Sequence, residues 1–138
     1  MAARRIDHRR LTALRTKTPH LSAVERGCLE RYVVGVAERL ADLDEVWLFG
    51  SAARGDMWPH RWPTNSDIDL VVVTAAPVAA GVQEELVNAV YELYLECGRT
   101  ISPQFRTAPE LAQARSERTP FAEGLGRDGV LLWSRAGL

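Results

Sequence analysis

Two aspartates separated by one residue stand at the start of an apolar run. Asp67 and Asp69 flank Ile68, and the run continues through Val73. Because side chains alternate along a strand, both carboxylates would point to one face, roughly 6–7 Å apart. Like charges this close repel unless a cation lies between them, and hard oxygen ligands suit Mg²⁺. An isolated Asp-x-Asp is also typical of a solvated strand end, so the interpretation depends on a second feature.

The second feature is the turn that follows the preceding apolar run, residues 46–49. Gly50 lets the backbone turn sharply and approach a ligand closely. Ser51 could cap a short helix beginning at Ala52, whose N–H groups would face an anion, or its hydroxyl could bond a terminal phosphate. Arg54 could add a charge-assisted phosphate contact. Gly-Ser with Arg is common turn chemistry by itself, but together with the carboxylate pair it predicts a metal and triphosphate site.

These two motifs resemble the signature of the DNA polymerase β-like nucleotidyltransferase superfamily, and by size its minimal nucleotidyltransferases. The resemblance covers residues 46–73 and consists of two segments, Gly50-Ser51-Ala52-Ala53-Arg54-Gly55 and Ser66-Asp67-Ile68-Asp69-Leu70. It implies transfer of a nucleoside monophosphate from an NTP, with ATP as the expected donor, and release of pyrophosphate. It also implies that the triphosphate is held by Gly50, Ser51, Arg54 and Ser66. Asp67 and Asp69 would hold two Mg²⁺ ions.

The sequence departs from the family pattern at the third carboxylate, which catalytic members supply from a later strand. Here that strand is expected over residues 99–106, which contain no Asp or Glu. By alternation Ser102 and Gln104 share a face, and either could occupy the position of the missing acid. Neither can act as an ionised base or as a strong Mg²⁺ ligand. The departure weakens the case for catalysis and leaves the case for a nucleotide site intact.

The second departure is a longer loop between the motif halves, residues 56–65, which carries Trp58, His60 and Trp62. The two tryptophans could form an adenine platform or a partner-docking patch, or they could anchor the loop on the domain. We expect His60 to be a surface histidine.

Composition is that of an ordinary globular protein. The chain has 138 residues, of which 46% are apolar and 25% charged, and a net charge near −1. We therefore expect one domain over residues 1–138, in which Cys28 and Cys97 are reduced packing thiols of a cytoplasmic protein. No apolar stretch has the length of a membrane span. Residues 1–20 are expected to form a basic helix or tail, most simply a solvated face or frayed end, with binding of RNA or of the phosphates of an acceptor as the less favoured alternative.

Alternating helices and strands predict an α/β fold with a small mixed sheet and helices packed mainly on one face. Helices are expected over residues 22–40, 82–96, 107–116 and 119–129, and strands over 45–49, 67–74, 99–105 and 130–133. Capping boxes are expected at Ser22 and Thr107, a C-cap at Gly98, and an edge strand or bulge at Pro103. The expected apolar positions of the second long helix are Leu86, Val87, Ala89, Val90, Leu93 and Tyr94.

Three classes of function remain open. The leading one is a Mg²⁺-dependent nucleotidyltransferase acting on a hydroxyl of a protein or small molecule. The resemblance implies that small members act as antitoxins whose partner is a HEPN-domain toxin. The second class is an inactive module that binds nucleotide or a partner. The third, an aminoglycoside-modifying enzyme, is less favoured because such enzymes need added structure to hold the acceptor.

Overall fold

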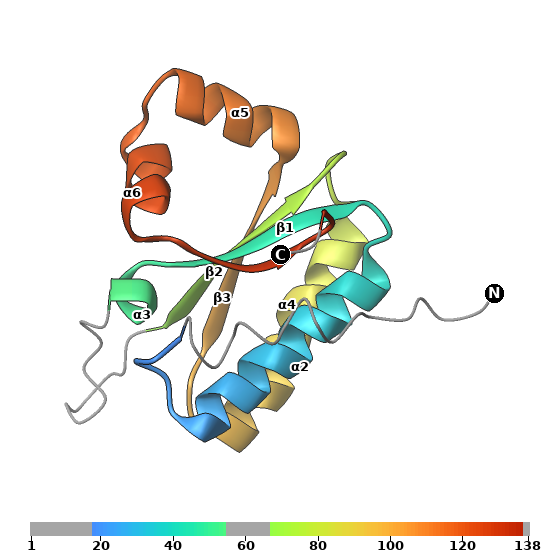
Figure 1. The fold of residues 1–138 in the computed structure, drawn as a ribbon. Helices are drawn as coiled ribbons and strands as arrows, with labels where there is room; N and C mark the ends of the chain where they lie inside the picture. Colours follow the sequence, from blue (N-terminus) through green and yellow to red (C-terminus); the bar gives the residue numbers. More distant parts are fainter. Residues whose placement is uncertain (1–17, 55–66, 137–138) are drawn as a thin grey trace.

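One four-stranded mixed sheet forms the centre of the molecule (Figure 1). The computed structural model describes residues 18–54 and 67–136. Its strands are β1 (Leu43–Phe49), β2 (Ile68–Thr74), β3 (Ile101–Thr107) and β4 (Val130–Ser134), in the order β3-β2-β1-β4. β1 runs antiparallel to β2 and β4, whereas β2 and β3 are parallel. The predicted α/β fold with a mixed sheet is confirmed.

The helices begin and end where local sequence signals place them. They are α2 (Ala23–Arg39), α3 (Ser51–Arg54), α4 (Ala80–Cys97), α5 (Ala108–Ser116) and α6 (Pro120–Asp128). Ser22 and Thr107 each form a complete capping box, and Gly98 ends α4 in the left-handed conformation with φ 69°. Pro103 lies on an edge strand as expected, because the edge needs fewer backbone donors. No helix in the described ranges is both long and apolar enough to cross a membrane.

The long helices α2 and α4 cover one face of the sheet (Figure 1). The larger of two hydrophobic clusters lies between this face and the two helices. β2 contributes Ile68, Leu70 and Val72 to it, and all three are fully buried. The Tyr32 hydroxyl on α2 donates a hydrogen bond to the Leu86 carbonyl on α4 at 2.8 Å. Burial of the phenol raises its pKa. This face is closed by apolar packing and by a helix-to-helix hydrogen bond.

The opposite face carries a smaller cluster beneath α5 and α6. From β2 it takes Val71 and Val73, which pack with Leu111 of α5 and Leu125 of α6. In Figure 1, α5 follows the end of β3, whereas α3 lies at the other end of the sheet, where β2 begins. The two clusters therefore divide β2 by alternation, as the strand pattern predicts.

Two of the apolar positions expected on α4 lie outside the core. Val87 and Tyr94 are exposed, and the buried line consists of Leu86 and Val90 with Ala89 and Leu93 partly covered. The apolar pattern of α4 is wider than the arc that the sheet and α2 can cover, so part of it faces outward.

The cysteines are free, as expected, but they are not isolated from each other. Burial raises the pKa of the Cys97 thiol, and the neighbouring Cys28 thiol raises it further. Next to them, Arg99 Nε lies 2.5 Å from Glu25 Oε2 in a buried ion pair. These contacts join the start of α2 to the end of α4.

Candidate active site

A sharp turn at Gly50 connects β1 to α3. Gly50 has φ +72°, and its carbonyl accepts hydrogen bonds from the N–H groups of Ala53 and Arg54, both at 3.1 Å. The helix begins at Ser51, so Gly50 takes the cap position and Ser51 is the first helical residue. The prediction that Ser51 caps a helix from Ala52 was therefore off by one residue. The helix starts one residue earlier than expected because the chain turns at Gly50, and glycine adopts this positive φ without strain.

Asp69 packs directly against this turn. Phe49, the last residue of β1, is the register partner of Asp69 on β2. A methyl group added to Gly50 would lie 2.7 Å from Asp69 Oδ2, well inside van der Waals contact. The absence of a side chain at Gly50 therefore lets the carboxylate lie on the turn. The two motifs that are separate in sequence form one site.

The charges of this site act on one another. Asp69 is half-buried, and burial is the largest cause of its raised pKa; the negative charge of Asp67 raises it further, whereas the positive charge of Arg54 lowers it. Asp67 is exposed immediately before β2. A divalent cation beside the pair would remove this repulsion, so the donor set fits the hard-metal site expected from the sequence.

Parallel pairing places β3 beside the acid pair. Ser102 is the register partner of Asp69. Gln104 is the register partner of Val71, which lies two residues farther along β2 from the Gly50 turn. Gln104 Oε1 accepts a hydrogen bond from Arg106 Nη2 at 3.4 Å. In the described ranges no three His, Cys, Asp or Glu side chains gather into a group that could hold a metal. Of the two candidates for the position of the third carboxylate, Ser102 lies nearer to Asp69.

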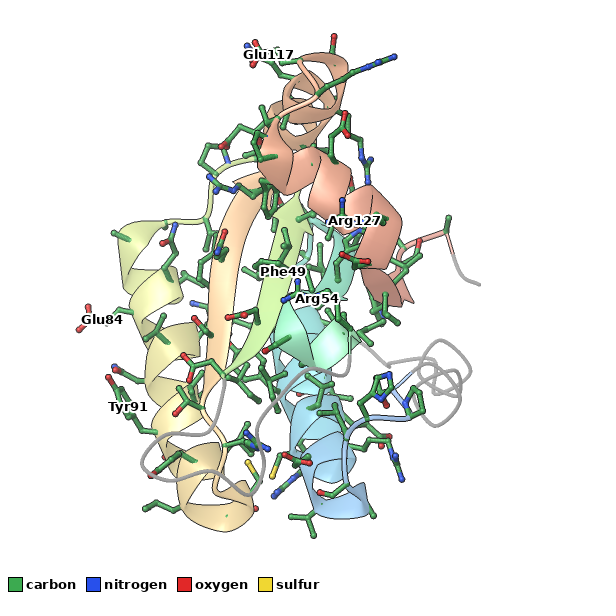
Figure 2. All side chains as sticks on the ribbon, turned by 90° about the vertical axis from the view of Figure 1, so that its left-hand side faces the viewer. Phe49, Arg54, Glu84, Tyr91, Glu117 and Arg127 are labelled. Carbon is green, nitrogen blue, oxygen red and sulfur yellow. The ribbon has the colours of Figure 1, made fainter. Side chains whose placement is uncertain are left out.

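Sequence reasoning missed an aromatic contact next to the site. Phe49 and Phe121 of α6 meet edge to face, with ring centroids 5.7 Å apart, and the Arg106 guanidinium lies 5.3 Å from the Phe121 centroid. In Figure 2, Phe49 and Arg54 are labelled at the part of the sheet where α3 and α6 lie. The signal was present in β1, where Trp47 and Phe49 alternate with the buried Val46 and Leu48. The contact holds α6 beside the face of the sheet on which Asp69 lies.

Three predicted features lie outside the described residues. They are Ser66, the loop with Trp58, His60 and Trp62, and the basic segment before Thr18. Their predicted roles stay predictions.

Comparison with known proteins identifies the family. The model of the family described as "Polymerase beta, Nucleotidyltransferase" matches residues 33–136, most of the chain. The chain belongs to the polymerase β nucleotidyltransferase family. This confirms the resemblance on which the site was predicted, since the matched range includes both the Gly50 turn and the aspartate pair. No curated protein matches the chain.

Solved structures with the same fold include proteins from toxin–antitoxin pairs. A mutant of the toxin–antitoxin MntA-HpeT aligns with a TM-score of 0.51 and 21% identity, over 77% of this chain and 72% of that one. A nucleotidyltransferase from Sulfolobus solfataricus aligns over 96% and 95%, with 22% identity and a TM-score of 0.46. A tri-AMPylated Shewanella oneidensis HEPN toxin in complex with MNT antitoxin gives 17% identity, 80% and 73% coverage and a TM-score of 0.48. At these identities the likeness concerns the fold.

Proposed function

We propose that this family member transfers a nucleoside monophosphate from an NTP, with ATP as the expected donor, to a hydroxyl group of a protein or small molecule. The observation that supports this most is the contact of Asp69 with the Gly50 turn. This contact brings the Gly50-Ser51 turn and the carboxylate pair together, which is the arrangement that binding of one triphosphate and its cations would require. In the reaction the acceptor oxygen bonds to the α-phosphorus, the bond to pyrophosphate breaks, and the hydroxyl proton passes to a water molecule.

The residues of the turn would hold the outer phosphates. Ser51 contributes its hydroxyl and backbone N–H, and Ser66 is the corresponding candidate before the acid pair. Arg54, whose charge already acts on Asp69, would offset charge on the departing pyrophosphate.

Asp67 and Asp69 would hold Mg²⁺, two ions when the NTP is bound. Burial, and after it the negative charge of Asp67, raises the pKa of Asp69, and a cation beside the pair would relieve the charge repulsion. When bound, Mg²⁺ supplies charge neutralisation and alignment of the attacking and leaving oxygens.

A transfer assay tests the proposal. The protein is incubated with Mg²⁺, NTP labelled on the α-phosphate and candidate acceptors, and compared with Asp69→Asn and with Glu30→Gln, which removes an exposed carboxylate of α2. We expect label transfer by the wild type and by Glu30→Gln, and a loss of about 10²-fold or more in Asp69→Asn. Equal transfer by Asp69→Asn would contradict the proposed role of the pair.

A second candidate is a module that binds nucleotide or a partner without chemistry. The position beside Asp69 favours it, because Ser102 cannot take a proton as an ionised carboxylate does. Calorimetry separates the two: Mg²⁺-dependent NTP binding without label transfer to any acceptor supports the module. Ser102→Asp supplies the missing carboxylate, and a gain of transfer in this variant would identify a site that lacks only its base.

For the acceptor we propose a HEPN-domain protein, with this chain as the antitoxin of the pair. The support is the family and the fold shared with the MntA-HpeT structure. Co-expression with a HEPN-domain protein, followed by mass measurement, tests the proposal. An added nucleoside monophosphate on the HEPN chain, absent with Asp69→Asn, is the expected result.

A further inference from the structure

The outer side of α4 carries an apolar stripe that the sheet does not use. Leu95 is 85% exposed, Tyr91 67%, Tyr94 48% and Val87 39%. At about 100° per residue these four positions share one side of the helix. The side that faces α2 is different, because there Glu85 pairs with Arg39 and Glu96 with Arg31. Figure 2 shows Tyr91 projecting outward from α4.

The stripe lies in a negative environment. α4 contains four glutamates, Glu84, Glu85, Glu92 and Glu96, and no Lys or Arg. Glu84 and Glu92 are exposed, and no ion pair involves either of them in the described part of the chain. The last turn, which holds Tyr94 and Leu95, also lacks a basic residue to offset the negative end of the helix dipole. A complementary partner therefore carries apolar side chains flanked by Lys or Arg.

The C-terminal end of α4 leads to the end of the sheet that holds the acid pair. α4 leads through Gly98 to Thr100, whose carbonyl accepts a hydrogen bond from Ile68 N at 2.8 Å. Two residues later Ser102 lies beside Asp69. The exposed end of α4 and the proposed active site therefore flank the same end of β3.

The edge of β3 itself does not favour an added strand. Because Ile68 N–H bonds to Thr100, the parallel register turns the backbone groups of Ser102 and Gln104 toward β2. Pro103 then faces outward, where it has no N–H to donate. Docking at this side of the molecule depends on the side chains of α4.

We propose that Val87, Tyr91, Tyr94 and Leu95 form a docking surface for a protein whose apolar face is flanked by cations. A second copy is disfavoured, because a twofold contact through this stripe would bring the glutamates of both copies together. An anionic membrane surface is disfavoured by the same charges. The inference deepens the proposed function: a protein docked here has its acceptor hydroxyl delivered past β3 to the acid pair.

The test uses two synthetic helical peptides, one of leucine and lysine and one of leucine and glutamate, titrated into ¹⁵N-labelled protein. We expect the cationic peptide alone to bind, with shift changes along α4, and Leu95→Arg to weaken its affinity about tenfold or more. The matched control is Val24→Arg, which places the same charge at a 60% exposed apolar position of α2 and should leave the affinity unchanged. Tm measured for both variants confirms that they fold.

Four outcomes would overturn the inference: no binding of the cationic peptide, equal binding of both peptides, shift changes away from α4, or equal weakening by Val24→Arg.

Sedimentation velocity and flotation with phosphatidylglycerol vesicles test the two alternative occupants, a second copy and a membrane. A wild-type dimer that Leu95→Arg dissociates would assign the stripe to a second copy, and binding to vesicles that Leu95→Arg abolishes would assign it to a membrane; either overturns the proposal. Calorimetry with Mg-ATP on the same variants keeps the claims separate. Peptide binding without Mg-ATP binding contradicts the proposed function only, and Mg-ATP binding without peptide binding contradicts this inference only.

Discussion

The two faces of β2 differ in kind although they come from one run of seven residues. Toward α2 and α4 the strand presents Ile68, Leu70 and Val72, all fully buried in apolar surroundings. Toward the other side it begins with Asp69, whose carboxylate lies on Gly50 and is repelled by Asp67. Apolar burial on the first face lowers the free energy of the folded state. On the second face, the charge of Asp69 raises it at the position where a ligand would bind. Alternation allows both in one strand, so substitutions on the two faces should have opposite consequences.

The largest loss of stability is expected on the closed face. Leu70→Ala removes a side chain with no exposed surface and leaves a cavity, at a cost of about 3 kcal/mol in the free energy of unfolding. Denaturant titration measures this cost. Mg-ATP should still raise the Tm of the variant by as much as it raises the Tm of the wild type, because the site is on the other face. A variant that folds but no longer responds to Mg-ATP would show that the faces are not independent.

The next prediction separates the effect of backbone strain on stability from the effect of the Gly50 turn on ligand binding. Gly50→Ala and Gly98→Ala both place a side chain at positive φ, which should cost about 1 kcal/mol in each variant. The added methyl group meets Asp69 Oδ2 at 2.7 Å in the first case and no atom within 4 Å in the second. We expect a lower Tm in Gly50→Ala than in Gly98→Ala, because the Asp69 carboxylate must also shift, and Mg-ATP binding lost only in Gly50→Ala. Loss of binding in both variants would point to a general effect of strain.

A smaller effect is expected from the hydrogen bond between the helices of the closed face. Tyr32→Phe removes the buried hydroxyl that donates to the Leu86 carbonyl and should destabilise the protein by about 1 kcal/mol or slightly less. Urea unfolding measures the change. A cost as large as that of Leu70→Ala would mean that this bond, rather than apolar burial, dominates the closed face.

The smallest effect has the opposite sign. Asp69→Asn removes a negative charge that burial and the neighbouring Asp67 disfavour, and should stabilise the metal-free protein by roughly 0.5 kcal/mol near neutral pH. Because the folded-state pKa of Asp69 is raised, its ionised form is the destabilised one, and the penalty is fully present above that pKa. The penalty fades as the pH falls through the raised pKa and is gone below the ordinary value of 3.8. Thermal unfolding of both proteins across this range should show the gap closing with acid.

Most of the fold follows from short sequence signals. The capping boxes at Ser22 and Thr107 and the terminal Gly98 placed three helix ends correctly, because each is decided by contacts within a few residues. Alternation placed the strands to within a few residues. The exposure of Val87 and Tyr94 was not predictable, because it depends on how much of α4 the sheet and α2 cover.

The candidate site was predictable only where short sequence signals decide it. Gly50 and Asp69 could be chosen from residue type and spacing, and the register of β1 with β2 brings them together. The preference for Ser102 over Gln104 required the parallel register of β3, which the sequence does not specify. Phe121 was missed because α6 reaches the site only through tertiary packing.

The strand order also has a kinetic consequence. β1, the first strand of the sheet, is paired on one side with β4, the last, as in the contact of Val46 with Trp133. Until the chain has closed that long loop, one edge of a strongly apolar strand stays open to other molecules. Pairings of such high sequence separation slow folding, so partly folded chains should aggregate from the β1 edge during refolding.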